Sequence, residues 1–156
     1  LMGSDLGGCR VLDAFAGSGA LGLEALSRGA SHATFVDSAA FALRAIEANV
    51  ESLGAGPHAR VARGDAFRMA SSGAVPGAPF GLLLVDPPYR IGSAQVASFL
   101  ADLARTGLLG PDAVVVWEHA ADEEADWPDG FEPVRSKRYG TTAFDIATYR
   151  GGPGPA

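Results

Sequence analysis

The residues with the clearest chemical potential lie at the end of one apolar run. The stretch LLLV at 82–85 leads directly into Asp86, Pro87, Pro88 and Tyr89. The prolines fix the backbone and remove two amide donors, so the carbonyls between them stay free to accept hydrogen bonds. A carboxylate, a rigid carbonyl and an aromatic ring suit a planar target with an exocyclic amino group. Asp86 and the Pro87 carbonyl can each accept one N–H, and Tyr89 can stack on the ring.

Such an arrangement would activate an aryl amine, which is a poor nucleophile because its lone pair is delocalised into the ring. Two acceptors that pull on the amine hydrogens favour a pyramidal nitrogen, whose lone pair can attack a methyl sulfonium. The same acceptors stabilise the positive charge that grows on nitrogen. We therefore assign Asp86, Pro87, Pro88 and Tyr89 as candidate catalytic residues for methyl transfer to an amine.

A glycine-rich loop offers a second site. The stretch DAFAGSGALG at 13–22 contains the G-x-G-x-x-G pattern of dinucleotide sites, between an apolar run and a helical pattern. Asp13, however, places a carboxylate where a pyrophosphate would lie. It would attract an amino group instead, which favours S-adenosylmethionine (SAM). We assign Asp13, Phe15, Gly17 and Gly19 as candidate cofactor-binding residues.

Two further acids end later strands. Asp37 ends HATFVD and can accept hydrogen bonds from a ribose diol. Asp65 in GDAF could accept from an adenine amino group, with the Ala66 amide at a ring nitrogen and Phe67 as an apolar wall. Both acids could also be ordinary helix-start residues. Because the carboxyl ends of parallel strands share one rim, their grouping predicts one ligand site.

These acids depend on alternating strands and helices to bring them together. The runs at 82–85 and 114–117 are apolar on both faces, which is typical of a covered parallel sheet. Ser38 and Gly54 are expected to cap the longest helix. The pattern predicts an α/β fold with a mostly parallel seven-stranded sheet, an antiparallel C-terminal hairpin and helices on both faces. The expected strands are 10–15, 32–37, 59–65, 80–86, 113–119, 132–140 and 141–150, the helices are 18–30, 38–54 and 93–107, and a loop covers 71–79.

Composition limits the class of protein. The 156 residues are 47% hydrophobic, enough for one domain, which we expect to span 1–150 with a disordered tail at 151–156. No apolar run could span a membrane, no leader is visible, and a single cysteine fits a reducing cytoplasm. Glu118 and His119 have no metal partner at a plausible spacing, so we interpret them as structural or rim residues. We expect a cytoplasmic protein without membrane or metal partners.

Four basic residues could still contact nucleic acid, although a net charge of −6 argues against binding by charge alone. Arg90 directly follows the proline motif, and Arg135, Lys137 and Arg138 lie beside Tyr139 in the expected hairpin. They could hold RNA phosphates next to an aromatic ring. Charge on an exposed edge strand also serves solubility. We assign the four as candidate RNA-binding residues.

From about Val11 to Tyr149 the sequence resembles the bacterial small-subunit ribosomal RNA guanine-N2 methyltransferases. The resemblance rests on LDAFAGSGALGLEALSRGA, FVD, GDA, LLLVDPPY and the late KRYG. It implies a Rossmann-like class I SAM-dependent methyltransferase that acts on one guanine of 16S rRNA, in the small ribosomal subunit or an assembly intermediate. It also implies SAM held by the glycine loop, Asp37 and Asp65, with Asp86 to Tyr89 at the amine.

The start of the sequence departs from this family. Its members carry a segment with a hairpin and an Arg-Pro-Thr-like motif before the glycine-loop strand. Here LMGSDLGGC leads almost at once into the first expected strand, so we expect that segment to be missing.

Three alternatives stay open. DNA adenine-N6 methyltransferases share the proline motif, although they usually need a target-recognition domain, and no such insert is visible here. A dinucleotide-dependent oxidoreductase would explain the glycines and Asp37 but not Asp86 to Tyr89. A non-catalytic SAM- or RNA-binding module would fit a chain without the N-terminal segment. The preferred prediction is methyl transfer from SAM to an exocyclic amine of a nucleobase, with guanine N2 of 16S rRNA as the first candidate.

Overall fold

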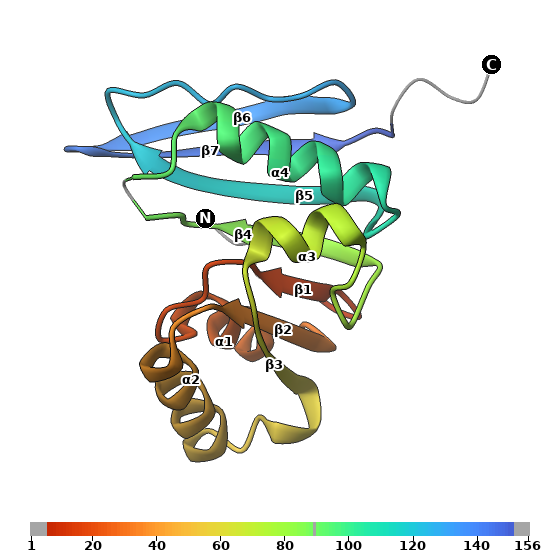
Figure 1. Ribbon diagram of the computed structural model, residues 1–156, viewed down its shortest axis with the longest axis vertical. Helices are drawn as coiled ribbons and strands as arrows, with labels where there is room; N and C mark the ends of the chain where they lie inside the picture. The colour runs from red at the N-terminus through yellow and green to blue at the C-terminus, as the bar shows by residue number, and fades with distance from the viewer. Residues whose placement is uncertain (1–5, 89, 152–156) are drawn as a thin grey trace.

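A single mixed sheet organises the molecule. The computed structural model describes residues 6–88 and 90–151. Seven strands lie in the order β3-β2-β1-β4-β5-β7-β6, with helices packed against both faces (Figure 1). The strands are β1 (Arg10–Asp13), β2 (His32–Asp37), β3 (Ala59–Arg63), β4 (Phe80–Val85), β5 (Leu109–Ala120), β6 (Phe131–Tyr139) and β7 (Thr142–Tyr149). The helices are α1 (Ala20–Ser27), α2 (Ala40–Ser52), the 3-10 helix η1 (Gly56–His58), α3 (Ala66–Ser72) and α4 (Ser93–Arg105).

The strand directions confirm the predicted α/β architecture. Strands β1 to β5 pair in parallel, whereas β7 pairs antiparallel with both β5 and β6. From β1 the chain moves outward to β2 and β3, then returns to place β4 on the other side of β1. This reversal is the topological switch point at which open parallel sheets bind ligands.

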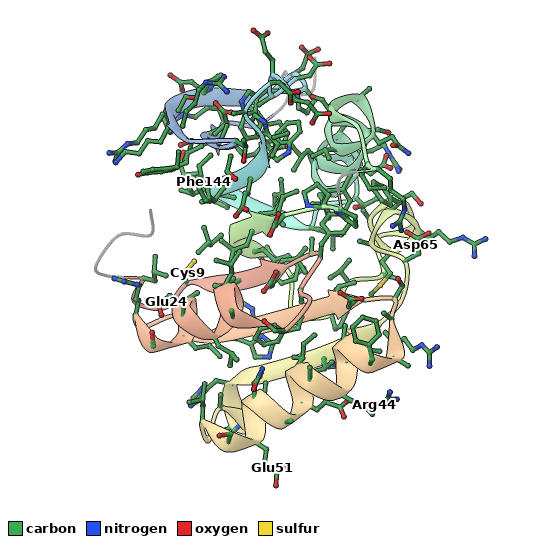
Figure 2. All side chains as sticks on the ribbon, turned by 90° about the vertical axis from the view of Figure 1, so that its left-hand side faces the viewer. Cys9, Glu24, Arg44, Glu51, Asp65 and Phe144 are labelled. Carbon is green, nitrogen blue, oxygen red and sulfur yellow. The ribbon has the colours of Figure 1, made fainter. Side chains whose placement is uncertain are left out.

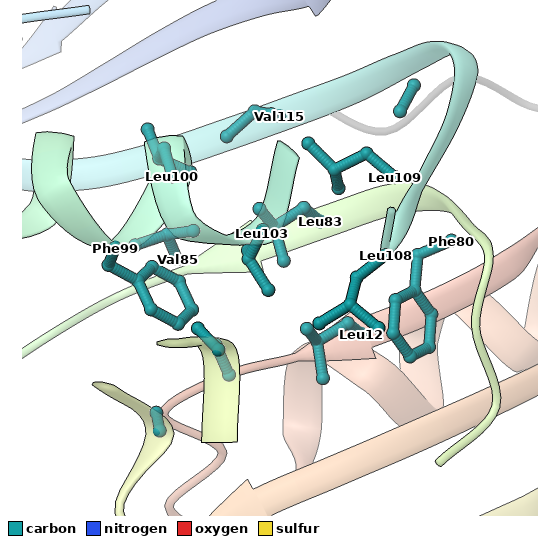
Figure 3. Close-up of a cluster of buried hydrophobic side chains, with 14 of the residues drawn as sticks. Leu12, Phe80, Leu83, Val85, Phe99, Leu100, Leu103, Leu108, Leu109 and Val115 are labelled. Carbon is teal, nitrogen blue, oxygen red and sulfur yellow. The ribbon is translucent and has the colours of Figure 1, made fainter. Parts of the chain in front are cut away.

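Side chains of β4 belong to two hydrophobic clusters, one on each face of the sheet. Leu83 and Val85 join the cluster under α3 and α4, where Phe99 is also buried (Figure 3). Leu82 and Leu84 point to the opposite face and join the cluster under α1 and α2. The strand is therefore apolar on both sides, as the sequence predicts, and burial of each such side chain contributes about 1.5–3 kcal/mol. The two clusters hold the end of β4 in place, directly before Asp86.

The face that carries α1 and α2 is covered over only part of the sheet. Its buried cluster draws on β1, β2 and β4, while Val116 of β5 is only half-buried. Ile146 pairs with Val116 and Phe144 with Glu118, so these side chains extend the same face across β7. Figure 2, viewed onto the carboxyl ends of the parallel strands, shows Phe144 on this side. Among the described residues, no helix packs over this part of the sheet.

Helix α3 is absent from the sequence prediction, which left 66–70 unassigned and made Ser71 and Ser72 part of a loop. Seven residues are too few for a recognisable apolar period, and the helix is fixed by its ends instead. The Asp65 carboxylate accepts the Phe67 amide at 2.9 Å, and Gly73 ends the helix with a φ of 73°. These end residues are the local signal for the helix.

Several boundaries also differ from prediction. The first strand ends at Asp13 because the chain turns into the glycine loop there. Ser38 does not cap α2; Ala39 holds that position and donates its amide to Asp37 Oδ1 at 2.9 Å. The expected stop at Gly54 is confirmed, with a φ of 65° just beyond the helix. Strand β5 begins early, at Leu109, since that residue pairs with Phe80 before a shift in register.

Helix length also bears on the expectation about membranes. Within residues 6–88 and 90–151, no helix combines the length and the apolar character that crossing a membrane requires.

Candidate active site

A cavity of about 750 Å³ opens at the carboxyl ends of the parallel strands. This volume is typical of cofactor and ligand pockets. Its wall comes from the ends of β1, β2, β4 and β5, the start of α3 and the loop before α4. The structure brings together ten residues that the sequence assigned to the site, namely Phe15, Gly17, Asp37, Asp65, Ala66, Phe67, Asp86, Pro87, Pro88 and Arg90.

The two assigned glycines of the loop have different surroundings. Gly17 is exposed on the cavity wall with a φ of 57°, and its amide donates to Asp37 Oδ2 at 3.0 Å. Gly19 is buried at the start of α1, where an added Cβ would contact Ile46 and Phe35. Gly17 therefore leaves the backbone open to a ligand, whereas Gly19 shapes the turn and does not line the cavity.

Asp13 lies beneath the loop rather than on the cavity wall. Its side chain is almost fully buried, and one oxygen accepts the Gly22 amide at 3.1 Å. Burial raises its pKa to about 7; the Gly22 hydrogen bond opposes the rise, and the charges of Asp86 and Asp37 add to it. Among the described residues no basic side chain forms an ion pair with it. An ammonium group of a ligand would supply the missing positive charge.

Asp37 and Asp65 each combine a local role with a place on the cavity wall. The two Asp37 oxygens accept the amides of Gly17 and Ala39, and Asp65 caps α3 through Phe67. An ionised carboxylate has about four acceptor sites, so each retains capacity for a ligand. Their assignment to the cofactor stays a prediction, now with a position that permits it.

An aromatic cluster forms the apolar side of the cavity. Phe15 lies 5.6 Å from both Phe67 and Phe99 between ring centroids, and Phe67 and Phe99 are 5.7 Å apart. Phe15 and Phe67 reach the cavity wall. Their rings provide a surface against which a flat heterocycle can pack.

The proline motif follows β4 on the same wall. The Pro88 carbonyl accepts the Ile91 amide at 2.9 Å, which folds the loop toward α4, whereas no described residue donates to the Pro87 carbonyl. Asp86 is exposed at the rim, yet the surrounding walls remove part of its solvent and raise its carboxyl pKa. Tyr89 lies outside the described residues, so its stacking role stays a prediction.

Two residues that the sequence interpretation left outside the site also line the cavity. Both ring nitrogens of His119 face acceptors, the Asp145 carboxylate and the Ala120 carbonyl, and its side chain is only 4% exposed. His119 thus links β5 to β7 and has no ring nitrogen free for a ligand. Glu118 is half-buried, and burial and the negative charge of Asp86 raise its pKa. The signal in the sequence that could have identified Glu118 as a site residue was its position near the end of β5, the strand next to β4.

The basic residues of the hairpin are divided by strand alternation. Arg135 pairs with Ile146 and Lys137 with Phe144, so these two project from the partly uncovered face. Arg138 projects from the opposite face and donates to the Ala121 carbonyl. None of the three lines the cavity, while Arg90 does.

The arrangement of possible metal ligands bears on the expectation about metals. Across the part of the chain that the structure describes, no group of three His, Cys, Asp or Glu side chains could hold a metal ion.

Known proteins resemble this chain over nearly its whole length. A family model described as "Conserved hypothetical protein 95" matches residues 1–148. The "Putative rRNA methyltransferase YlbH" of Bacillus subtilis is 35% identical over 154 residues, which cover 97% of this chain and 82% of that protein. The "Ribosomal RNA small subunit methyltransferase D" of Escherichia coli K12 is 39% identical over 138 residues, covering 88% and 67%. The solved structure "Putative methyltransferase yhhF from Escherichia coli" superposes with a TM-score of 0.81 at 31% identity, covering 92% and 78%.

Proposed function

The chain belongs to the ribosomal RNA small subunit methyltransferase D family, and from this membership we propose that it transfers a methyl group from SAM to guanine N2 in 16S rRNA. Its fold is that of the class I methyltransferases, as predicted from sequence. The observation that carries the proposal is the common cavity of the Asp86 motif and the glycine-loop side. A methyl donor and an amine acceptor can therefore lie next to each other.

The residues of the cavity fit SAM. Beneath the cavity wall, Asp13 is a buried carboxylate without a cationic partner among the described residues, and its charge would attract the ammonium of the methionyl group. Asp37 and Asp65 would accept hydrogen bonds from the ribose and the adenine, and Phe67 would pack against the adenine ring. When bound, SAM supplies an electrophilic methyl group on a sulfonium.

On the acceptor side, Asp86 and the Pro87 carbonyl would each accept one N–H of the amino group. The Pro88 carbonyl accepts the Ile91 amide, whereas no described residue donates to the Pro87 carbonyl. Asp86 is the stronger acceptor, and stabilises positive charge on the amine, when it is ionised, and its pKa is raised. The rate of transfer should therefore fall as the pH drops through that raised pKa.

The substrate assignment rests on the relatives and on the size of the site. Both curated relatives carry names that describe rRNA methyltransferases. A cavity that holds one base requires a target nucleotide that is unpaired or turned out of its helix. The partner would be 16S rRNA in the small subunit or in an assembly intermediate, which places the reaction in the cytoplasm.

Transfer of radioactive methyl groups from SAM tests the proposal directly. Naked 16S rRNA, assembled small subunits and DNA are offered in parallel, and the labelled nucleoside is identified by chromatography. We expect N2-methylguanosine from one of the two ribosomal substrates. Label in N6-methyladenine of DNA would replace the proposal by the adenine alternative, and no label in any substrate would reject methyl transfer.

Removal of the Asp37 carboxylate should weaken SAM binding. Asp37→Ala loses the acceptor for the ribose and releases the Gly17 amide, so we expect a loss of roughly 1.5–3 kcal/mol of binding free energy, the range of charge-assisted hydrogen bonds. Calorimetric titration with SAM measures it, with NAD as the ligand control. Asp129→Ala, in an exposed loop away from the cavity, should bind SAM normally. Equal SAM affinity in Asp37→Ala, or tight binding of NAD, would contradict the assignment.

A further inference from the structure

Glu118 is a second carboxylate beside the amine site. Val85 of β4 pairs with Trp117 of β5, so the next residues, Asp86 directly after β4 and Glu118 within β5, lie side by side. Both line the cavity. Strand alternation points them the same way, since each lies two residues beyond a side chain of the α1 face, Leu84 and Val116 respectively.

No described residue satisfies this carboxylate. Glu118 forms neither a hydrogen bond nor an ion pair there, and the neighbouring His119 is committed to Asp145. Burial and the charge of Asp86 both raise the Glu118 pKa, so both favour its protonated form relative to a carboxyl group in water. A ligand that presents N–H donors to both acids would stabilise the pair in the ionised form.

Guanine has such an edge. Its N1–H and its N2 amino group lie next to each other and are both donors. Adenine also carries an amino group beside N1, but its N1 is an acceptor. The lone pair of that nitrogen would face a lone pair of the carboxylate oxygen, and the two would repel each other. Neighbouring carboxylates therefore match guanine and reject adenine.

We propose that Glu118 accepts the N1–H of the target guanine while Asp86 and the Pro87 carbonyl hold its N2 amino group. Glu118 is then the residue that selects guanine over bases whose N1 is unprotonated. This role rests on the proposed function, because it assumes a guanine in the cavity.

A guanine analogue that lacks O6, and therefore the N1 hydrogen, tests the contact. Once the methylated guanine is mapped, 2-aminopurine is placed at that position; it keeps the amino group but has an acceptor at N1. The measurement is the single-turnover rate of methyl transfer to each RNA at saturating SAM. Wild type should prefer guanine by about tenfold to a hundredfold, the value of one charge-assisted hydrogen bond.

Both Glu118 variants should lower this ratio. Glu118→Ala should methylate guanine more slowly and lose most of the preference. In Glu118→Gln the amide can accept the guanine N1–H through its oxygen or donate to N1 of 2-aminopurine through its nitrogen, so the ratio should also fall well below that of wild type. Glu51→Gln, an exposed acid on α2 that does not line the cavity, should keep the wild-type ratio.

The outcomes separate the inference from the proposed function. If wild type methylates guanine N2 and both Glu118 variants keep the wild-type ratio, the inference is wrong and the proposed function stands. If wild type methylates no guanine, the proposed function itself fails. SAM affinity, which should stay within about twofold of wild type in both variants, shows that they are folded.

Discussion

Asp86→Ala is expected to lower the rate of methyl transfer by about a hundredfold or more while SAM binding is largely retained. Asp86 lies at the end of β4 on the acceptor side of the cavity, so its loss removes an acceptor that is needed most as charge develops on the amine. Asp86→Asn should be milder, because its amide oxygen can still accept one N–H. Single-turnover rates and SAM dissociation constants, measured on the same preparations, separate the two effects.

The pH dependence gives this prediction a second test. Because the Asp86 pKa is raised, the wild-type rate should fall on the acid side as the carboxylate becomes protonated. Asn cannot titrate, so Asp86→Asn should lose the part of this fall that belongs to Asp86, and the parts due to Glu118 and Asp13 should remain. Asp122→Ala, exposed beyond β5, should behave as wild type. Normal methylation by Asp86→Ala would reject the role given to the motif.

Asp13→Asn is expected to stabilise the protein without SAM at alkaline pH. The folded state keeps the Asp13 proton up to about pH 7, whereas the unfolded chain releases it near pH 4. Between these values the folded state binds more protons, so the free energy of unfolding decreases as pH rises, and the loss is complete above about pH 7. At about 1.4 kcal/mol per pKa unit, the buried charge costs roughly 2–4 kcal/mol. Asparagine removes this cost and can still accept the Gly22 amide.

Urea unfolding between about pH 4.5 and pH 8.5 measures the difference. The stability curves of wild type and Asp13→Asn should be close at the acid end and diverge as pH rises, with the variant above. Asp129→Asn, an exposed acid, should run parallel to wild type. SAM should stabilise wild type more than Asp13→Asn, since the ammonium loses its carboxylate partner. Parallel curves for wild type and Asp13→Asn would show that Asp13 carries no uncompensated charge.

The sheet could be predicted because each of its main signals is local. The run before Asp86 is apolar at successive positions, which is typical of a strand buried on both faces, and the structure places Leu83 and Leu84 in opposite clusters. The hairpin after α4 was predictable from its two neighbouring strand patterns. Helix α3 was not, because seven residues carry too little periodicity and its stability comes from packing against α4 and from the Asp65 cap.

The sequence predicted those site residues that lie at the ends of parallel strands. Asp37 and Asp86 end parallel strands and reach one cavity. The burial of each side chain could not be predicted from the sequence, because it depends on neighbours that are distant in sequence. Asp13 is buried under Gly22, and Glu118 gains its importance only from the pairing of β4 with β5. The assignments of individual residues to SAM and RNA stay predictions.

The basic residues of β6 project from both faces of the sheet, and this affects the rate at which the protein associates with RNA. Arg138 projects from the opposite face of the sheet. The candidate RNA contacts at the cavity and on the partly uncovered face are therefore Arg90, Arg135 and Lys137, and the chain as a whole has a net charge of −6. Three neutralised phosphates correspond to a slope of roughly −2 in log affinity against log salt for single strands. Long-range attraction would thus contribute little to the association rate. Encounters would be governed by how often the target base is presented in an accessible shape, so the timing of modification would follow the folding of the RNA.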